Sequence, residues 1–167
     1  RTFVRKDPEK QLYLVLEGVS SCAEIEVNGR YVGYTQGAHL QAEFDLSNFA
    51  DAGENTLVIR VHKWCSGSYL EDQDFLRFNG LFRDVYLLER PVGHIADVEL
   101  RTEDRCLHIR TERPTEAVLR DAQGKVVAEG TFDGTGELTV AAPILWNAEK
   151  PYLYDLTLRC AGEEIHQ

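Results

Sequence analysis

Short segments in which apolar and polar residues alternate constrain the fold of this chain more than any other feature. Residues 11–16 and 22–27 alternate in this way, and Asn28-Gly29 follows the second segment directly. An Asn-Gly pair between two such segments predicts a β-hairpin, because both central residues of the tight turn need positive φ. Further strand-like segments lie at 31–34, 57–62 and 85–88. No convincing amphipathic helix interrupts them, so the sequence predicts an all-β fold.

The pattern changes after Pro91. Strand-like segments become shorter and are separated by turn signals such as Arg113-Pro114 and Asp133-Gly-Thr-Gly136. We expect these strands near 95–101, 105–112, 116–121, 125–130, 136–141 and 152–160. Short strands with frequent turns are typical of a β-sandwich, so a second sandwich is predicted to begin after Pro91.

Composition excludes several classes of function. The 167 residues include 43% hydrophobic residues, enough for a buried core. The formal net charge of −10 argues against binding to nucleic acid or to an anionic membrane surface. The chain has no spanning apolar segment and no signal peptide at its start. It contains no Met, so we expect a fragment or a processed product.

Four cysteines are scattered along the chain without a Cys-x-x-Cys pair: Cys22, Cys65, Cys106 and Cys160. Zinc sites need closely spaced ligands, so none is expected. We predict buried free thiols, which is typical of a reducing cytoplasm, and therefore a cytoplasmic protein.

Residues 66–88 combine an acidic run with large apolar side chains, a mixture typical of neither a solvated loop nor a core strand. Two of the carboxylates of Glu71, Asp72 and Asp74 could in principle form an acid/base pair. On an extended segment, however, Asp72 and Asp74 point the same way and Glu71 points the other way. They could equally be held in a structural loop, or contact a ligand. The residue types leave these three interpretations open.

Arg77 and Arg83 follow the acidic run closely. Guanidinium groups pair well with carboxylates, so both arginines are candidates to pair with Asp72 or Asp74 and hold the loop in place. We found no nucleophile elbow, no phosphate-binding glycine loop and no histidine pair with metal-ligand spacing.

Residues 67–87 read Gly-Ser-Tyr-Leu-Glu-Asp-Gln-Asp-Phe-Leu-Arg-Phe-Asn-Gly-Leu-Phe-Arg-Asp-Val-Tyr-Leu. This stretch resembles the signature of the β-galactosidases of glycoside hydrolase family 2, which contains Gly-Ser-Tyr-Leu-Glu-Asp-Gln-Asp and Phe-Arg-Asp-Val. Val27-Asn-Gly29, Val32-Gly-Tyr34 and Ala42-Glu-Phe-Asp-Leu46 are similar to the family's sugar-binding jelly roll. Ile144-Leu-Trp-Asn-Ala-Glu-Lys-Pro-Tyr-Leu-Tyr154 is similar to its immunoglobulin-like domain.

The resemblance implies a sugar-binding jelly-roll domain at 1–91, lacking its N-terminal strands, and an immunoglobulin-like β-sandwich at 92–167, lacking its last strand. It also implies that this chain has no catalytic residues. The family's retaining catalysis uses two glutamates on a TIM barrel, which takes typically ~250 residues, more than this chain contains. The expected function is the non-catalytic portion of a β-galactosidase that hydrolyses substrates such as lactose.

One site residue is carried over from the family by position. Asp74 corresponds to the aspartate that reaches from the jelly roll into the active site, binds near the galactose 6-hydroxyl and helps hold sodium. Glu71, Asp72, Arg77 and Arg83 are expected to brace its loop. The fragment itself needs no cofactor, whereas the full enzyme is expected to use magnesium and sodium. Its expected partners are the galactoside, the TIM barrel and further copies of itself in a homo-oligomer.

Two other classes of function remain open. Jelly rolls are common lectin scaffolds, and Tyr31, Tyr34 and Tyr69 could stack on sugars in a free-standing carbohydrate-binding module. A purely structural pair of sandwiches is the third interpretation.

Overall fold

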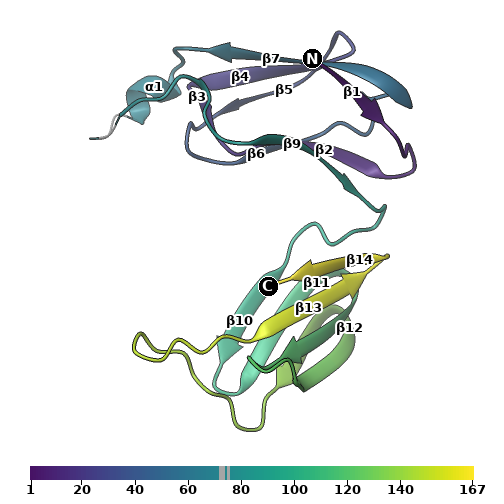
Figure 1. Ribbon diagram of the computed structural model, residues 1–167, viewed down its shortest axis with the longest axis vertical. Helices are drawn as coiled ribbons and strands as arrows, with labels where there is room; N and C mark the ends of the chain where they lie inside the picture. Colours follow the sequence, from purple (N-terminus) through teal and green to yellow (C-terminus); the bar gives the residue numbers. More distant parts are fainter. Residues whose placement is uncertain (72–73, 75) are drawn as a thin grey trace. The chain divides into compact units, whose positions relative to one another are not determined.

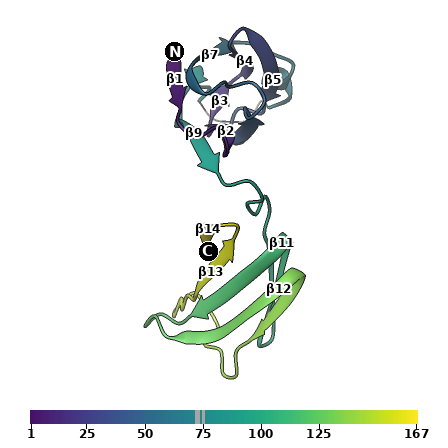
Figure 2. The ribbon, with the colours of Figure 1, turned by 90° about the vertical axis from the view of Figure 1, so that its right-hand side faces the viewer.

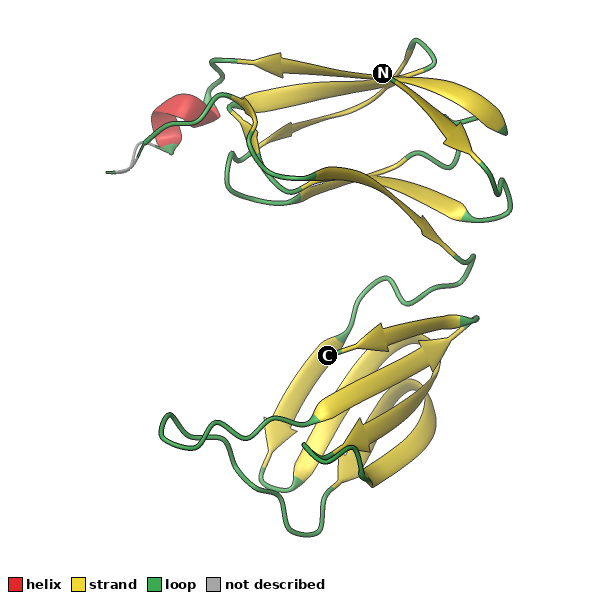
Figure 3. Ribbon diagram, viewed as in Figure 1, coloured by secondary structure: helices red, strands yellow, loops and turns green. Residues whose placement is uncertain are grey.

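The regular secondary structure of the described residues is almost entirely β-strand, joined by loops (Figure 3). The computed structural model describes residues 1–71, 74 and 76–167. The chain divides into two compact units, Arg1–Arg90 and Pro91–Gln167 (Figure 1). One helix, α1 (Gly67–Leu70), spans four residues, and within the described ranges no helix has the length and apolar character to cross a membrane. The all-β prediction is confirmed.

The described residues of unit 1 form nine strands: β1 (Thr2–Arg5), β2 (Gln11–Leu16), β3 (Val19–Ser20), β4 (Cys22–Val27), β5 (Arg30–Gln36), β6 (Ala42–Asp45), β7 (Gly53–His62), β8 (Gly80–Leu81) and β9 (Val85–Arg90). One sheet has the order β1-β7-β4-β5, and a second has the order β6-β2-β9. The short strands β3 and β8 pair separately. All these pairings are antiparallel, as expected for a jelly-roll type of sandwich.

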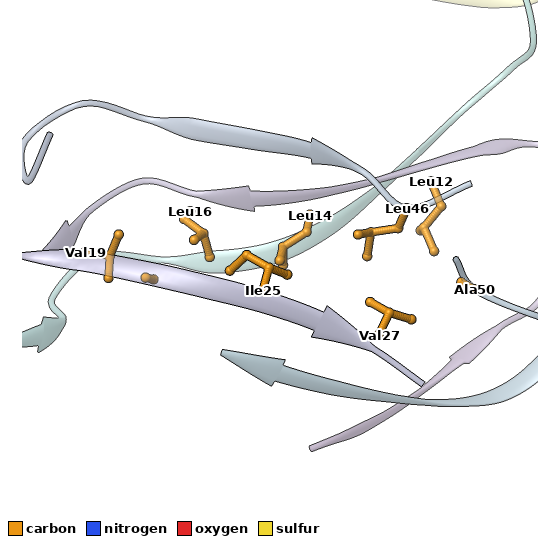
Figure 4. Close-up of a cluster of buried hydrophobic side chains, with 9 residues drawn as sticks. Leu12, Leu14, Leu16, Val19, Ile25, Val27, Leu46 and Ala50 are labelled. Carbon is orange, nitrogen blue, oxygen red and sulfur yellow. The ribbon is translucent and has the colours of Figure 1, made fainter. Parts of the chain in front are cut away.

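The core of unit 1 lies between its two larger sheets (Figure 4). Leu12, Leu14 and Leu16 of β2 share one face of their strand, because side chains two residues apart point the same way. They pack with Ile25 and Val27 of β4, which alternate in the same manner. The alternation in the sequence thus produces the sandwich.

The predicted Asn-Gly hairpin is confirmed. Asn28 has φ 53° and Gly29 has φ 75°, and the flanking residues Val27 and Arg30 are paired across β4 and β5. The Asn28 side chain also accepts a hydrogen bond from the Thr56 N–H (2.9 Å), which ties the turn to β7.

Arg5 is a buried cation, only 6% exposed. Its Nη1 donates to the carbonyl oxygens of Ser47 (2.9 Å) and Ala50 (2.6 Å). Its Nη2 donates to those of Pro8 (3.1 Å) and Lys10 (2.8 Å). One guanidinium therefore satisfies backbone acceptors on two separate connections of unit 1.

Unit 2 is a curled sheet of five strands: β10 (Glu99–Glu103), β11 (Cys106–Arg120), β12 (Val126–Thr139), β13 (Asp155–Cys160) and β14 (Glu163–His166). Its order is β10-β11-β13-β14, and β12 also pairs with β11. A core of seven buried side chains fills the unit: Ile95, Ile109, Ala117, Leu119, Leu138, Leu156 and Leu158. This is the predicted immunoglobulin-like sandwich.

Two predicted turns in unit 2 are wrong. The strands continue through Pro114 and through Gly134, so that β11 and β12 each run as one long ribbon (Figure 2). The pairing shifts register between Arg110 and Pro114, and Gly134 adopts φ 81°. A bulge accommodates a proline within a strand because the ladder is interrupted there, so these turn signals bend the two strands without ending them.

Candidate functional site

Residues 63–84 leave the sandwich of unit 1 and return to it, and both ends of this segment are anchored. At its start, the Ser21 hydroxyl donates to the Lys63 carbonyl (2.9 Å), and the Ser21 N–H donates to the His62 carbonyl (3.1 Å). At its end, β8 pairs with β3, with Leu81 opposite Val19. The sheets of unit 1 therefore hold the two ends of the segment.

A glycine allows the close approach at the returning end. The Phe82 ring packs on Gly18, where an added Cβ would lie 2.9 Å from the ring's Cζ. The Phe82 N–H donates to the Gly18 carbonyl (3.2 Å). A larger residue at position 18 would push the ring, and with it the segment, away from the sandwich.

A hollow of about 700 Å³ lies beside this segment. Its lining combines the connection between β5 and β6 with part of the segment: Gly37, Ala38, His39, Leu40, Glu71, Leu76 and Phe78. The Glu71 carboxylate crosses between the two, because its Oε2 accepts a hydrogen bond from the Ala38 N–H (3.2 Å). The hollow is largely apolar, with a carboxylate in its wall.

Three rings form an aromatic wall next to the hollow. The Phe78 and Phe82 rings stack with centroids 5.0 Å apart, and the His39 ring lies 5.5 Å from Phe82. No motif or periodicity in the sequence identifies this group, since His39 comes from the connection between β5 and β6 and the two phenylalanines come from the segment 63–84. The sequence alone therefore does not predict this wall.

Asp74 is exposed to solvent and is not among the residues that line the hollow. A carboxylate in this position is accessible to a hydroxyl group or a cation from outside the chain. Asp72 lies outside the described residues, so its predicted bracing role stays a prediction. The same holds for the role of Asp74 in binding.

The two predicted bracing arginines lie in different surroundings. Arg77 lines a second, smaller pocket together with Ser20, Ser68 and Glu71. Arg83 donates from Nη1 to the Glu17 carbonyl (3.4 Å), and its guanidinium lies 5.5 Å from the centre of the Phe82 ring. Arg83 thus contacts the returning end of the segment. Whether either arginine pairs with Asp72 stays a prediction.

A polar network fixes the one-turn helix at the start of the segment. The Ser66 hydroxyl (3.3 Å) and the Tyr34 hydroxyl (2.9 Å) both donate to Oε1 of Gln36. The Cys65 N–H donates to the Ser68 hydroxyl oxygen (3.1 Å).

Of the four cysteines, which were all predicted to be buried, Cys22 is buried and the other three are partly exposed.

Tyr34 is expected to ionise late in an alkaline titration. Its hydrogen bond with Cys22 and its partial burial raise its pKa from 10.0 to about 12. Because the folded state favours the neutral phenol, the stabilisation from this group is complete below pH 10.0 and is lost as the pH rises through about 12. Absorbance of tyrosinate followed against pH measures the step. Tyr34→Phe should remove the step near pH 12, and Cys22→Ala should move it towards 10.0; an unchanged curve in either variant would contradict this assignment.

The described residues do not make a metal site on their own. Residues 1–71, 74 and 76–167 contain no group of three or more His, Cys, Asp or Glu side chains placed to hold a metal ion. A hard cation takes several oxygen ligands, so Asp74 can supply part of a shell at most. The magnesium and sodium expected for the full enzyme stay predictions.

Both units match a known family. Residues 3–91 match the family described as "Glycosyl hydrolases family 2, sugar binding domain", and residues 88–167 match the one described as "Glycosyl hydrolases family 2". Together the two matches extend over nearly the whole chain.

Individual relatives agree with these matches. The chain is 43% identical over 178 aligned positions to a β-galactosidase of Actinobacillus pleuropneumoniae, and 39% identical over 171 to one of Halalkalibacterium halodurans. These alignments cover 100% and 91% of this chain but 18% and 17% of the two relatives.

A solved structure has the same fold. A β-glucuronidase from an uncultured Clostridium species superimposes with a TM-score of 0.78 at 25% identity, covering 99% of this chain and 33% of that one. Sequence and structure lead to the same assignment: the chain belongs to glycosyl hydrolase family 2.

Proposed function

We propose that this chain is the non-catalytic portion of a β-galactosidase that hydrolyses terminal β-galactosides such as lactose. Unit 1 is the sugar-binding domain, and unit 2 is the spacer that positions a TIM-barrel catalytic domain. Asp74 completes the galactose pocket, and Glu71, Asp72, Arg77 and Arg83 support its loop. The whole enzyme is a cytoplasmic homo-oligomer that uses magnesium and sodium.

The observation that carries this proposal is the identity to β-galactosidases. Those relatives reach 43% identity, and their alignments cover 91% or more of the chain. The chain spans only about 18% of the length of the first of them, so most of a galactosidase of that size would lie beyond the residues described here. The β-glucuronidase with the same fold is 25% identical, which supports the galactoside over the glucuronide as substrate.

The position of Asp74 supports its proposed role. Its carboxylate is exposed on a segment that is fixed to the sandwich at both ends. In the proposed mechanism Asp74 orients the substrate, and the glutamates of the barrel carry out the chemistry.

The isolated chain is expected to show no hydrolysis of a chromogenic β-galactoside above the buffer blank. A retaining glycosidase needs two carboxyl groups about 5–5.5 Å apart, and the proposal assigns both to the barrel. Clear turnover by the 167-residue chain would overturn the proposal.

A free-standing carbohydrate-binding module is the second candidate. Tyr31 is 59% and Tyr69 76% exposed, and the Tyr69 ring stacks with Trp64 at a centroid distance of 6.3 Å. Exposed rings of this kind can stack on sugars. Titration calorimetry of the isolated chain with galactose and lactose separates the two candidates: tight binding without turnover favours the binding module, and no binding favours the portion of an enzyme.

A further inference from the structure

Two cysteines from different elements meet on the outer face of the β1-β7-β4-β5 sheet. Cys22 begins β4 and lies opposite His62 in the antiparallel pairing with β7. Cys65 follows His62 by three residues, and its Sγ lies 3.7 Å from the carbonyl oxygen of Ser21, the residue directly before Cys22. Both thiols are free, and each influences the pKa of the other. The register of β4 and β7 is what brings them together.

The two thiols differ in exposure. Cys22 is 2% exposed, whereas Cys65 is partly exposed at the surface. A reagent from solvent therefore reaches Cys65 first, and Cys22 lies behind it as a second thiol. Pairs in which an accessible cysteine is backed by a second one are typical of reversible thiol oxidation.

The two thiols also differ in acidity. Burial raises the pKa of Cys22. Burial acts in the same direction on Cys65, but hydrogen bonds from the Ser68 hydroxyl and N–H, from Cys22 and from the Gly67 N–H outweigh it and lower the pKa. The thiolate is the nucleophile in thiol chemistry, so Cys65 is the more reactive member of the pair at neutral pH.

We propose that Cys22 and Cys65 form a reversible disulfide when the protein meets a small disulfide such as oxidised glutathione, and that this bond fastens the α1 turn to β4. The cross-link would join a strand of the sandwich to residues 65–70, from which the segment carrying Asp74 continues.

The exchange proceeds in two balanced steps. The Cys65 thiolate attacks one sulfur of the small disulfide, whose S–S bond breaks, and the other half leaves with the electron pair and takes a proton. Cys22 then loses its proton, and its sulfur attacks Cys65 in the mixed disulfide, releasing the second small thiol. Two protein thiols are oxidised to one disulfide, and the small disulfide is reduced to two thiols.

The other two cysteines provide internal controls. Cys106 interacts with the Thr139 hydroxyl at 3.5 Å, and Cys160 donates to the Gly93 carbonyl at 3.5 Å. Both belong to unit 2 and are also partly exposed. Exposure alone would let them react as readily as Cys65, whereas the proposal gives the disulfide to the Cys22–Cys65 pair.

The experiment uses the reduced 167-residue chain, incubated with oxidised glutathione, alkylated and digested without reductant. Mass spectrometry is expected to find the Cys22 and Cys65 peptides joined, with the mass of two hydrogen atoms lost, and to find them separate again after dithiothreitol. The Cys106→Ser/Cys160→Ser variant should give the same cross-link, and Cys65→Ser should lose it. Peptides that stay separate under full oxidation, or cross-links that join Cys106 or Cys160 as often, would overturn the proposal.

A second measurement tests the fastening of the turn and needs no variant. Hydrogen exchange of the backbone amides in 65–70 should slow on oxidation of the wild-type chain and return to its former rate on reduction, while exchange in unit 2 stays unchanged. If the disulfide forms and exchange in 65–70 does not slow, the proposed fastening is wrong.

Discussion

Replacing Asp74 with alanine in the proposed whole β-galactosidase is expected to lower kcat/KM for a chromogenic β-galactoside by about 10- to 100-fold. The reason is the loss of a charged acceptor for a sugar hydroxyl, since hydrogen bonds to charged groups contribute about 1.5–3 kcal/mol and each 1.4 kcal/mol is a factor of ten. Asp74→Asn keeps an acceptor oxygen and loses the charge, so its activity should lie between those of Asp74→Ala and the wild type. Steady-state kinetics on the purified variants measures both effects.

The control for this experiment is the same substitution at Asp133, an exposed aspartate in β12 of unit 2. Asp133→Ala should leave kcat/KM close to the wild-type value. Circular dichroism of all three variants establishes that the fold is intact. If Asp74→Ala retains full activity while folded, Asp74 does not bind the substrate, and the site assignment fails independently of the family.

Replacing Arg5 with leucine is expected to lower the free energy of unfolding of unit 1 by about 3–5 kcal/mol. Leucine fills much of the space but donates no hydrogen bond, so the four carbonyl oxygens that Arg5 now satisfies lose their donor. Each polar group that becomes buried without a partner costs about 1–3 kcal/mol, and groups near the surface recover part of that from water. The free energy gained by burying leucine offsets only part of the loss.

Urea unfolding followed by tryptophan fluorescence measures this change. The chain has two tryptophans, Trp64 in unit 1 and Trp146 in unit 2, so a Trp146→Phe background leaves one reporter for unit 1. Arg30→Leu is the matched control, because exposed Arg30 donates one hydrogen bond to a backbone carbonyl, that of Asn48. Its effect should be about 1 kcal/mol or less. Equal losses in the two variants would show that the buried position of Arg5 does not matter.

The parts of the fold that local patterns encode could be predicted from the sequence. The Asn28-Gly29 turn and the alternating strands on either side of it follow from φ preferences and from the two-residue period of a strand. The turns predicted at Arg113-Pro114 and at Gly134 failed because a turn residue has two uses. It can end a strand or bend it at a register shift, and pairing with a distant strand decides between the two.

The candidate site, too, could be predicted from the sequence only in part. The acidic run around Glu71 and Asp74 stands out in the sequence because its residue types are unusual next to large apolar side chains. The wall formed by His39, Phe78 and Phe82 gives no such signal, since it depends on the contact between His39 and Phe82, which lie about 40 residues apart in the chain. Long-range pairing of strands creates these contacts, and one sequence without its fold does not contain them.

The long strand β11 has a consequence for how unit 2 opens. Its first half pairs with β10 and its second half with β13, while β12 follows it along both halves. Fraying that begins at one end of unit 2 therefore breaks the pairing of only one half of β11. The hydrogen bonds of the other half of β11 remain and hold that half in place. Unit 2 is expected to open as one cooperative unit, in which partly open states are rare. The backbone amide hydrogens of the outer strands β10 and β14 should exchange with solvent only through brief fraying of the strand ends.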